Sequence, residues 1–303
     1  MSSRRNKGRS VNGVLLLDKP LGVGSNEVLQ IVKRMFDARK AGHTGSLDRL
    51  ATGLLPLCFG EATKMSGFLL NADKRYLSTF RLGVVTNTGD AEGEVLEDND
   101  VEDFSDGRVE EVLERFRGEI SQIPPMHSAI KQNGQRLYKL AHKGLTVERE
   151  PRTVTIHQLA LLERKPSELH VDITCSKGTY IRTLAEDVGR ALGCGASVSY
   201  LHRVASGPFE ASAMIGLDVL KENVGQGGDA LDKFLLPTDS ALEHYPMVEL
   251  TEDGAFYVRQ GQPVLVARAP TSGWVRIYVK SGLFMGVGEV LEDGRIAPRR
   301  LLR

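Results

Sequence analysis

The segment AGHTGSLDRLATG, residues 41–53, gathers several side chains that can take part in chemistry. It sets Asp48 and His43 among three glycines, which allow a backbone to approach a ligand closely or to adopt positive φ. Exposed amides in such a loop can bind phosphate oxygens, and an aspartate held there can act as a base or a nucleophile. Aspartate also caps turns frequently, so the composition leaves a catalytic and a purely structural role for Asp48 open.

A second dense segment, SKGTYIRT at residues 176–183, stands where a strand is expected to end and a helix to begin. Helix N-termini attract anions. Lys177, Tyr180 and Arg182 can therefore contact a phosphate, stack on a base, or pair with a catalytic carboxylate. A plain helix start with a surface arginine fits the same pattern, and periodicity does not separate these interpretations.

Several familiar active-site motifs are absent from the sequence. It contains no G-x-x-x-x-G-K-[ST], no G-x-G-x-x-G opening a helix, no H-E-x-x-H and no G-x-S-x-G. Nucleotide hydrolysis, dinucleotide binding and zinc hydrolysis therefore lose their usual sequence support. The histidines lack metal-ligand spacing, so we expect no metal site. They are His43, His127, His142, His157, His170, His202 and His244.

Hydrophobic periodicity predicts the elements that must position these residues. GVLLLD at residues 13–18 predicts a buried strand, and Ser25 is expected to cap a helix whose apolar positions recur from residue 28 to 36. A further helix is predicted over residues 181–192, ending at Gly193. Other strands are predicted at 76–82, 153–161 and 169–174, with a helix at 109–116. The chain is therefore expected to be α+β.

Length and composition favour one large domain with a small appendage. The 303 residues are 41% hydrophobic and 26% charged, which is enough to bury a sizeable core. A boundary is predicted near residue 248, giving domains 1–248 and 249–303. Beyond it, apolar runs at 264–267, 274–279, 283–291 and up to 302 predict about four short strands in a compact β-barrel.

The formal net charge of zero conceals a bipolar distribution. Residues 90–119 contain 13 acidic and 3 basic residues, which leaves 26 acidic and 36 basic residues elsewhere. Basic residues concentrate between 131 and 152 and at both termini, where a polyanion can bind, although charged termini are often only solvated tails. The terminal ones are Arg4, Arg5, Lys7, Arg9, Arg299, Arg300 and Arg303.

The sequence also predicts a compartment. No apolar run reaches the roughly 18 residues of a spanning helix, and the basic N-terminus has no apolar stretch behind it. The three cysteines form no C-x-x-C pair and are odd in number, so neither a disulfide framework nor a zinc ribbon is indicated. We therefore expect a protein of the reducing cytoplasm.

Taken together, the motifs GHTGSLD and LATG, with LLLDKP upstream and CSKGTYIRTLAED downstream, resemble the bacterial TruB family of tRNA pseudouridine(55) synthases. The resemblance runs through nearly the whole chain, including GEATK, DKRY, GCGA and APRRL. It implies a central mixed, mainly antiparallel sheet flanked by helices, followed by a small β-barrel similar to a PUA domain. It also implies that one uridine in the T loop of tRNA is converted to pseudouridine, by breaking the glycosidic bond at N1 and rejoining the sugar at C5, without cofactor or metal.

The resemblance carries roles onto individual residues. The family's nucleophilic aspartate matches Asp48, its aromatic residue that stacks on the target base matches Tyr76, and the basic partner of the aspartate matches Arg182. Tyr76 is expected to serve in both catalysis and substrate binding. The further binding positions that the resemblance implies are His43, Tyr180, Leu201 and Asp90, the last near Arg182 and Tyr180.

One departure from the family stands beside the expected nucleophile. The family has proline there, whereas this chain has Arg49. Proline would hold its own φ at about −65° and favour an extended Asp48, and arginine does neither. Looser geometry, no effect and a new phosphate contact all remain open, and our hypothesis is an active enzyme with reduced turnover. His127 also replaces a common tyrosine, and Lys19 and Pro20 form the family's KP turn, which is expected to be structural.

Functions from different classes remain open at this point. The chain can be a uridine isomerase that depends on Asp48, or a tRNA-binding or tRNA-folding module with impaired isomerisation. An RNA other than tRNA is a third possibility. We expect the T-arm stem-loop of tRNA as the partner, no membrane, no nucleotide cofactor and a monomer.

Overall fold

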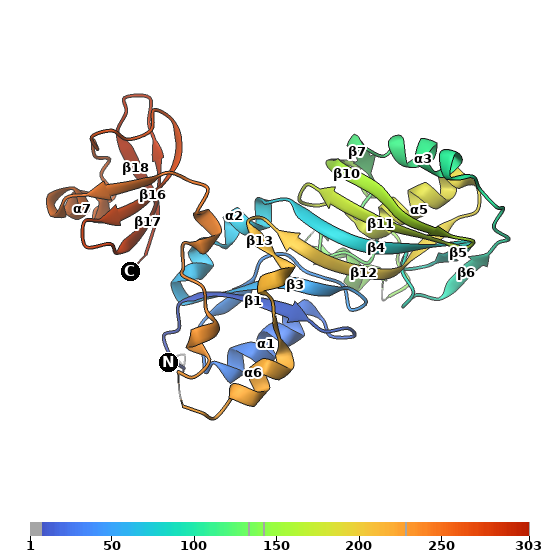
Figure 1. The fold of residues 1–303 in the computed structure, drawn as a ribbon, viewed down its shortest axis with the longest axis horizontal. Helices are drawn as coiled ribbons and strands as arrows, with labels where there is room; N and C mark the ends of the chain where they lie inside the picture. The colour runs from blue at the N-terminus through green and yellow to red at the C-terminus, as the bar shows by residue number, and fades with distance from the viewer. Residues whose placement is uncertain (1–7, 133, 142, 228, 303) are drawn as a thin grey trace.

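The computed structural model describes residues 8–132, 134–141, 143–227 and 229–302, and its largest unit is a ten-stranded sheet (Figure 1). Arg4, Arg5, Lys7, His142 and Arg303, which the sequence analysis named, lie outside the described residues. The strands of the sheet are β1 (Gly13–Lys19), β2 (Ala41–His43), β3 (Thr52–Phe59), β4 (Lys74–Leu82), β7 (Gly118–Gln122), β10 (Arg152–Lys165), β11 (Glu168–Cys175), β12 (Ala196–Ser206), β13 (Phe209–Glu210) and β14 (Ile215–Gly216).

Neighbouring strands follow the order β14, β1, β3, β12, β4, β11, β10, β7, with β2 beside β3 and β13 beside β12. Only β1 with β14 and β3 with β12 pair in parallel, and the other pairs are antiparallel. The predicted mixed, mainly antiparallel sheet is therefore confirmed. Its centre is β4, which lies between β12 and β11 and carries Tyr76 opposite Arg203 on one side and Ile173 on the other.

Helices cover the sheet at both ends (Figure 1). The α-helices are α1 (Ser25–Met35), α2 (Ser66–Asn71), α3 (Asp106–Glu114), α4 (Leu137–Ala141), α5 (Ile181–Leu192), α6 (Leu217–Asn223) and α7 (Glu252–Arg259). The 3-10 turns are η1 (Gly60–Lys64), η2 (Ala211–Ala213), η3 (Asp232–Phe234) and η4 (Ser240–Leu242). Two short hairpins pair β5 (Val84–Thr86) with β6 (Val95–Asp98) and β8 (Lys131–Gln132) with β9 (Gln135–Arg136).

The two helices nearest the chemistry form because their apolar residues recur at helical spacing. Helix α1 buries Val28, Leu29 and Val32 in the main core, and α6 lies against it. Helix α5 buries one face from Ile181 to Leu192 and packs on β12 and α3. It ends at Gly193, whose φ of 91° favours glycine.

The C-terminal part forms a separate four-stranded sheet beside α2 (Figure 1). Its strands are β15 (Met247–Leu250), β16 (Gly273–Val279), β17 (Phe284–Val290) and β18 (Ile296–Leu301). A small apolar cluster joins the two parts, since Val287 of β17 packs in the same cluster as Met65 and Leu69 near α2. Lys64 Nζ also donates a hydrogen bond to the carbonyl oxygen of Leu301, at 2.8 Å.

Some local predictions were wrong. Ser25 is the first residue of α1 and not its cap, because its hydroxyl is bonded to Leu47 instead. The run 264–267 forms only an isolated bridge from Val264 to Ile296, and the fourth strand of the small sheet is β15. Arg268, with φ of 59°, follows the run, and the chain turns there.

Two central strands, β3 and β12, were not predicted. In β3 the sequence carries Pro56, which normally argues against a central strand. The edge of β3 that faces away from β1 is paired in two stretches. There β12 pairs with Thr52 and Gly53, and β2 pairs with residues 57–59. Pro56 lies between these two stretches.

Candidate active site

A cavity of about 800 Å³ opens where the loop between β2 and β3 meets β4, β12 and the start of α5. Its lining includes six of the seven residues singled out from the sequence. They are Asp48, Tyr76, Asp90, Tyr180, Arg182 and Leu201. These positions span more than 150 residues of the chain, so the fold brings together what the sequence separates.

The chemical centre of the cavity is an ion pair. Arg182 Nε lies 2.9 Å from Oδ2 of Asp48 and 3.8 Å from Oδ2 of Asp90. The side chains of Arg182 and Asp90 are each 5% exposed, whereas that of Asp48 is 45% exposed. One carboxylate therefore faces the open cavity while its partners are fixed beneath it.

Arg182 is held by more than the carboxylates. Its Nη1 donates to the carbonyl oxygen of Thr88 at 2.6 Å, and its Nη2 donates to that of His127 at 2.8 Å. Asp90 is fixed in turn, since it accepts hydrogen bonds from the Thr88 hydroxyl at 2.6 Å and from the backbone N–H of Glu92 at 3.1 Å. These contacts hold the guanidinium in place beside the Asp48 carboxylate.

The loop that carries Asp48 is fastened at several backbone positions. The Ser25 hydroxyl donates to the carbonyl oxygen of Leu47 at 2.9 Å and lies 2.7 Å from the Leu47 nitrogen, whose N–H it accepts. On the other side of Asp48, the carbonyl oxygen of Arg49 accepts from Gly22 N–H at 2.9 Å and lies 3.5 Å from Lys19 Nζ. Both neighbours of Asp48 in the sequence are therefore hydrogen-bonded to residues 19–25.

Lys19 shows why the KP turn is rigid. It is fully buried and its ammonium also donates to the carbonyl oxygens of Pro20 and Val23, at 2.9 and 2.6 Å. Burial lowers the pKa of Lys19 to about 8, and the nearby charge of Asp48 opposes that shift. The structural role expected for Lys19 is consistent with these contacts.

Tyr76 and Leu201 form an apolar wall of the cavity. They lie on the adjacent strands β4 and β12 and are 9% and 6% exposed. Burial raises the pKa of the Tyr76 phenol, and the positive charge of Arg203 opposes that shift. The phenol therefore stays neutral at physiological pH and offers a flat apolar face.

Tyr180 is the residue immediately before α5. Its N–H donates to Gln122 Oε1 at 3.1 Å, and its carbonyl oxygen accepts from Gln122 Nε2 at 3.3 Å. Burial raises the pKa of its phenol. These two hydrogen bonds to Gln122, at the end of β7, fix the backbone of Tyr180, two positions before Arg182.

His43 is the one predicted site residue that does not line the cavity. It lies on β2, and its Nδ1 is buried without a hydrogen-bond partner among the described residues. Its pKa is lowered by burial first and by the charge of Arg203 second, so the imidazole is neutral near pH 7.

Arg203 is a site residue that the sequence analysis missed. It is 1% exposed, its Nε donates to the carbonyl oxygen of Leu54 at 2.7 Å, and its Nη2 donates to that of Gly45 at 3.3 Å. It thus supports the Asp48 loop from β12, next to Tyr76. A signal was present, because Leu201, Arg203 and Ala205 alternate on the buried side of the strand.

Lys74 is a second missed residue. It is 7% exposed and lines the cavity, while its ammonium donates to three carbonyl oxygens at the end of α2. Burial lowers its pKa to about 8, with the charge of Arg203 as the next cause. Buried cations therefore surround one exposed carboxylate, and the cavity suits a ligand with an anionic backbone.

Arg49 lies at the rim and differs from these buried cations. Its side chain is 60% exposed and, among the described residues, forms an ion pair only with Glu27, at 3.5 Å. Its N–H has no acceptor among the described residues, so a proline there would remove no hydrogen bond that the described structure makes.

The described residues carry neither a metal-binding group nor a membrane-spanning helix. Within the described ranges, no cluster of three or more histidines, cysteines, aspartates or glutamates is placed to hold a metal ion. None of the helices that the structure describes is both long and apolar enough to cross a bilayer.

Three family models match consecutive parts of the chain. Residues 33–181 match the TruB family pseudouridylate synthase N-terminal domain. Residues 182–243 match the tRNA pseudouridylate synthase B C-terminal domain, and residues 246–302 match the C-terminal model of pseudouridine synthase II TruB.

Curated relatives resemble the chain over nearly its full length. It is 56% identical over 299 residues to tRNA pseudouridine synthase B of Nitrosococcus oceani, covering 99% of this chain and 97% of that protein. It is 54% identical over 296 residues to the protein of the same name from Pseudomonas aeruginosa, covering 97% of each. Among solved structures, a chain of a Cbf5–Nop10–Gar1 complex is 26% identical, with a TM-score of 0.73 over 95% of this chain and 84% of that one.

Proposed function

Because this chain belongs to the TruB family of pseudouridylate synthases, we propose that it converts the T-loop uridine at position 55 of tRNA to pseudouridine, with Asp48 as the reacting carboxylate. The observation that carries the proposal is the Asp48–Arg182 ion pair at the open side of a cavity walled by Tyr76. The coarser activity, isomerisation of a tRNA uridine to pseudouridine, follows from the family.

The target nucleotide must leave its stack before Asp48 can reach it. Extruding a nucleotide costs a few kcal/mol, roughly, and the enzyme must supply replacement contacts. Stacking on Tyr76 contributes on the order of 1–3 kcal/mol, and Leu201 adds apolar contact on the same wall. Tyr180 and Asp90 lie where they can orient the base and its sugar. His43 lies on β2, outside the lining of this cavity, and stays a predicted substrate-binding residue.

Asp48 must act on the sugar. It either attacks C1′ or removes the 2′ proton, and both routes need an ionised carboxylate that faces the sugar. The Arg182 guanidinium balances that charge and fixes the carboxylate. After the N1–C1′ bond breaks, the uracil turns, C5 bonds to C1′, the proton on C5 leaves to solvent and N1 takes up a proton. Atoms are conserved, and no cofactor or metal is required.

The rest of the molecule binds the RNA. Residues 1–248 form the catalytic domain in this proposal, and residues 249–303 form a PUA-like RNA-binding domain. The T-arm stem-loop is the recognised element, and the protein acts as a cytoplasmic monomer. Basic side chains contact the phosphate backbone, so affinity should fall steeply as salt rises.

The test is tritium release from a tRNA transcript labelled at C5 of uridine. The parent protein should release tritium, and Asp48→Asn should release none while binding the tRNA as tightly. Asp218→Asn, which alters an exposed aspartate of α6, serves as the matched control and should behave like the parent. If the parent releases no tritium while it and Asp48→Asn both bind tRNA in a salt-sensitive way, the isomerase proposal is wrong and RNA binding alone remains.

A further inference from the structure

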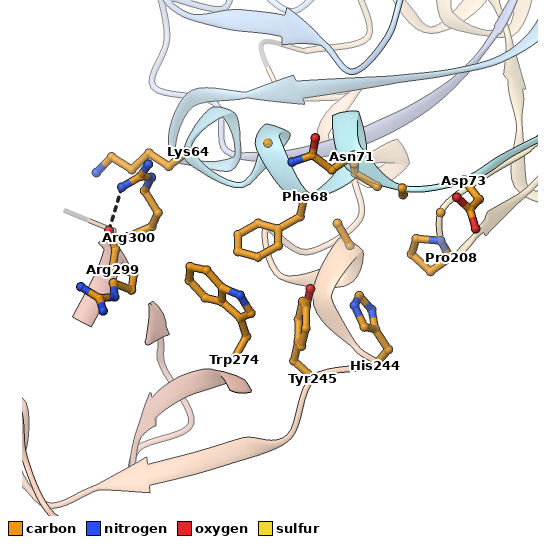
Figure 2. A pocket seen from close by; sticks show the side chains of 15 residues that line it. Lys64, Phe68, Asn71, Asp73, Pro208, His244, Tyr245, Trp274, Arg299 and Arg300 are labelled. Atoms are coloured by element: carbon orange, nitrogen blue, oxygen red, sulfur yellow. Dashed lines mark hydrogen bonds between the residues drawn. The ribbon is translucent and has the colours of Figure 1, made fainter. Parts of the chain in front are cut away.

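A second large cavity lies at the seam between the two parts of the molecule (Figure 2). Its volume is about 860 Å³, and its lining comes from α2, from the turn after β12, from the segment before β15, and from β16 and β18. We call it the seam cavity, and none of the residues proposed for catalysis lines it.

Aromatic side chains from both parts of the molecule line the seam cavity. Phe68 of α2 stands edge-on to Trp274 of β16, with ring centroids 5.2 Å apart, and edge-on to Tyr245, at 5.6 Å. His244 continues the row, 3.9 Å from Tyr245. Figure 2 shows these rings around the opening, with Pro208 facing His244. Rings that are only partly buried offer free faces on which a planar base can stack.

Positively and negatively charged side chains lie at opposite ends of the seam cavity. Lys64, Arg299 and Arg300 lie at one end, and Asp73 lies at the other (Figure 2). Lys64 and Arg299 have carboxylate partners, Glu61 and Glu289, but no carboxylate among the described residues lies within ion-pair distance of Arg300. Arg300 is exposed, and among the described residues its guanidinium donates only to the carbonyl oxygen of Arg299, at 3.0 Å. A phosphate suits the arginine end, and a base amine or ribose hydroxyl suits the Asp73 end.

The seam cavity shares a wall with the cavity that holds Asp48, which we call the catalytic cavity after its proposed role. Leu70, near the end of α2, lines the catalytic cavity, whereas its neighbours Phe68 and Asn71 line the seam cavity. Lys177, which precedes α5, donates from Nζ to Asn71 Oδ1 at 2.8 Å and adds an exposed cation at this shared wall. A polyanion bound at Asp48 therefore meets further positive charge as it crosses α2 toward Arg300.

From this arrangement we propose that the seam cavity binds one unpaired nucleotide of the RNA substrate, other than the target uridine. Its base stacks on the row of rings formed by Trp274, Tyr245 and His244, and its phosphate contacts Arg300. The inference rests on the proposed function for the identity of the RNA, but it concerns a separate site with a different readout. Base stacking with a backbone contact recognises an unpaired nucleotide without strong sequence preference.

The first experiment measures affinity for a full-length tRNA transcript. Trp274→Ala should weaken binding about tenfold, because it removes a ring on which the base stacks. Arg300→Gln should weaken binding and lower the slope of log affinity against log salt by about one, as expected for the loss of one phosphate contact. Phe256→Ala and Arg259→Gln alter an exposed aromatic residue and an exposed arginine of α7 that do not line the cavity, and they should bind like the parent.

Trp274 also packs on Phe68, so its loss can loosen the seam itself. Trp274→Phe keeps a ring and should restore most of the affinity, and Arg300→Gln removes no buried contact. Parent affinity in both Trp274→Ala and Arg300→Gln would overturn the proposal. Equal weakening by the α7 control variants would overturn it as well.

The second experiment locates the nucleotide. Ultraviolet crosslinking of the tRNA to the parent should yield a peptide that contains Trp274 or Tyr245 joined to an unpaired nucleotide other than the target. Crosslinks confined to peptides of the catalytic cavity would overturn the proposal. Neither binding nor crosslinking depends on turnover, so a failure of the seam site is distinguishable from a failure of Asp48-dependent isomerisation, which tritium release reports.

Discussion

The two cavities flank the same short helix, α2, but they differ in how deeply their positively charged side chains are buried. In the catalytic cavity the cations are buried and bonded to main-chain carbonyl oxygens, as Arg182, Arg203 and Lys74 show. In the seam cavity Arg299 and Arg300 are exposed, and the buried contacts are made by rings. The first arrangement places the Asp48 carboxylate beside a fixed cation, and the second leaves Arg300 without a carboxylate partner among the described residues.

In the two proposals above, the cavities have different tasks. Stabilising a changing charge requires groups that are already oriented, because reorganisation during the reaction raises the barrier. Holding a flexible polyanion requires only charge and stacking surface. Substitutions in the catalytic cavity should therefore change turnover and stability, whereas substitutions in the seam cavity should change affinity.

The largest effect is expected at Arg182. Arg182→Met removes the partner of Asp48 and leaves the carbonyl oxygens of Thr88 and His127 without their donor. We expect kcat to fall by roughly 10²-fold or more, comparable to the loss of one preorganised donor, with tRNA affinity changed much less. Single-turnover tritium release and filter binding measure the two quantities.

Arg190→Met is the matched control for Arg182. It alters an exposed arginine on the same helix, 74% exposed and paired only with Asp187. It should leave kcat unchanged. If Arg182→Met weakened tRNA binding as strongly as it lowered kcat, the division of tasks between the two cavities would be wrong.

A further test concerns the buried support of the loop. Arg203→Leu removes the donor to the buried carbonyl oxygen of Leu54 and to the partly buried one of Gly45, and we expect a loss of about 3 kcal/mol in the free energy of unfolding. Urea unfolding measures this loss. Arg203→Lys keeps the charge and should recover part of it. An unchanged free energy in Arg203→Leu would contradict the supporting role of this residue.

Lys74 predicts a dependence of stability on pH. Its pKa is about 8 in the folded protein and 10.5 when unperturbed, so between these values the unfolded chain holds more protons. Raising the pH from 8 to about 10 should therefore stabilise the parent relative to Lys74→Met, by up to about 2–3 kcal/mol. Urea unfolding of both proteins at the two pH values measures this difference, and a constant difference would refute the buried, depressed lysine.

The smallest effect is expected at Arg49. Arg49→Pro restores the family residue at a position whose N–H has no acceptor among the described residues, and we expect single-turnover rates to rise by about two- to fivefold because Asp48 becomes more restricted. Arg49→Ala separates the loss of the cation from the effect of the proline ring. Equal rates in the parent and Arg49→Pro would contradict the hypothesis that Arg49 reduces turnover.

The sequence predicted those parts of the site that are local in the chain. The Asp48 loop and the start of α5 each carry their chemistry within a few consecutive residues, and the helical spacing of 181–192 is unambiguous. The family resemblance then paired Asp48 with Arg182, which the ion pair now joins at 2.9 Å.

The parts that could not be predicted depend on distant strands. Arg203 reaches Gly45 across 158 positions of the chain, and only the pairing of β12 with β3 and β4 brings them together. Ser25 has the type of a helix cap, but its tertiary contact with Leu47 outweighs that local preference. The seam cavity likewise exists only because the C-terminal sheet lies against α2 (Figure 1).

The Ser25 hydroxyl that joins α1 to Leu47 has a thermal consequence. The loop that carries Asp48 loses its conformational entropy when the protein folds. It therefore does not have to be ordered again each time RNA binds. Its ordering is then part of the cooperative transition that melts the sheet, since Gly22 and Arg203 join the same loop to the turn after β1 and to β12. On heating, catalytic activity should therefore persist up to the melting of the domain and vanish together with it.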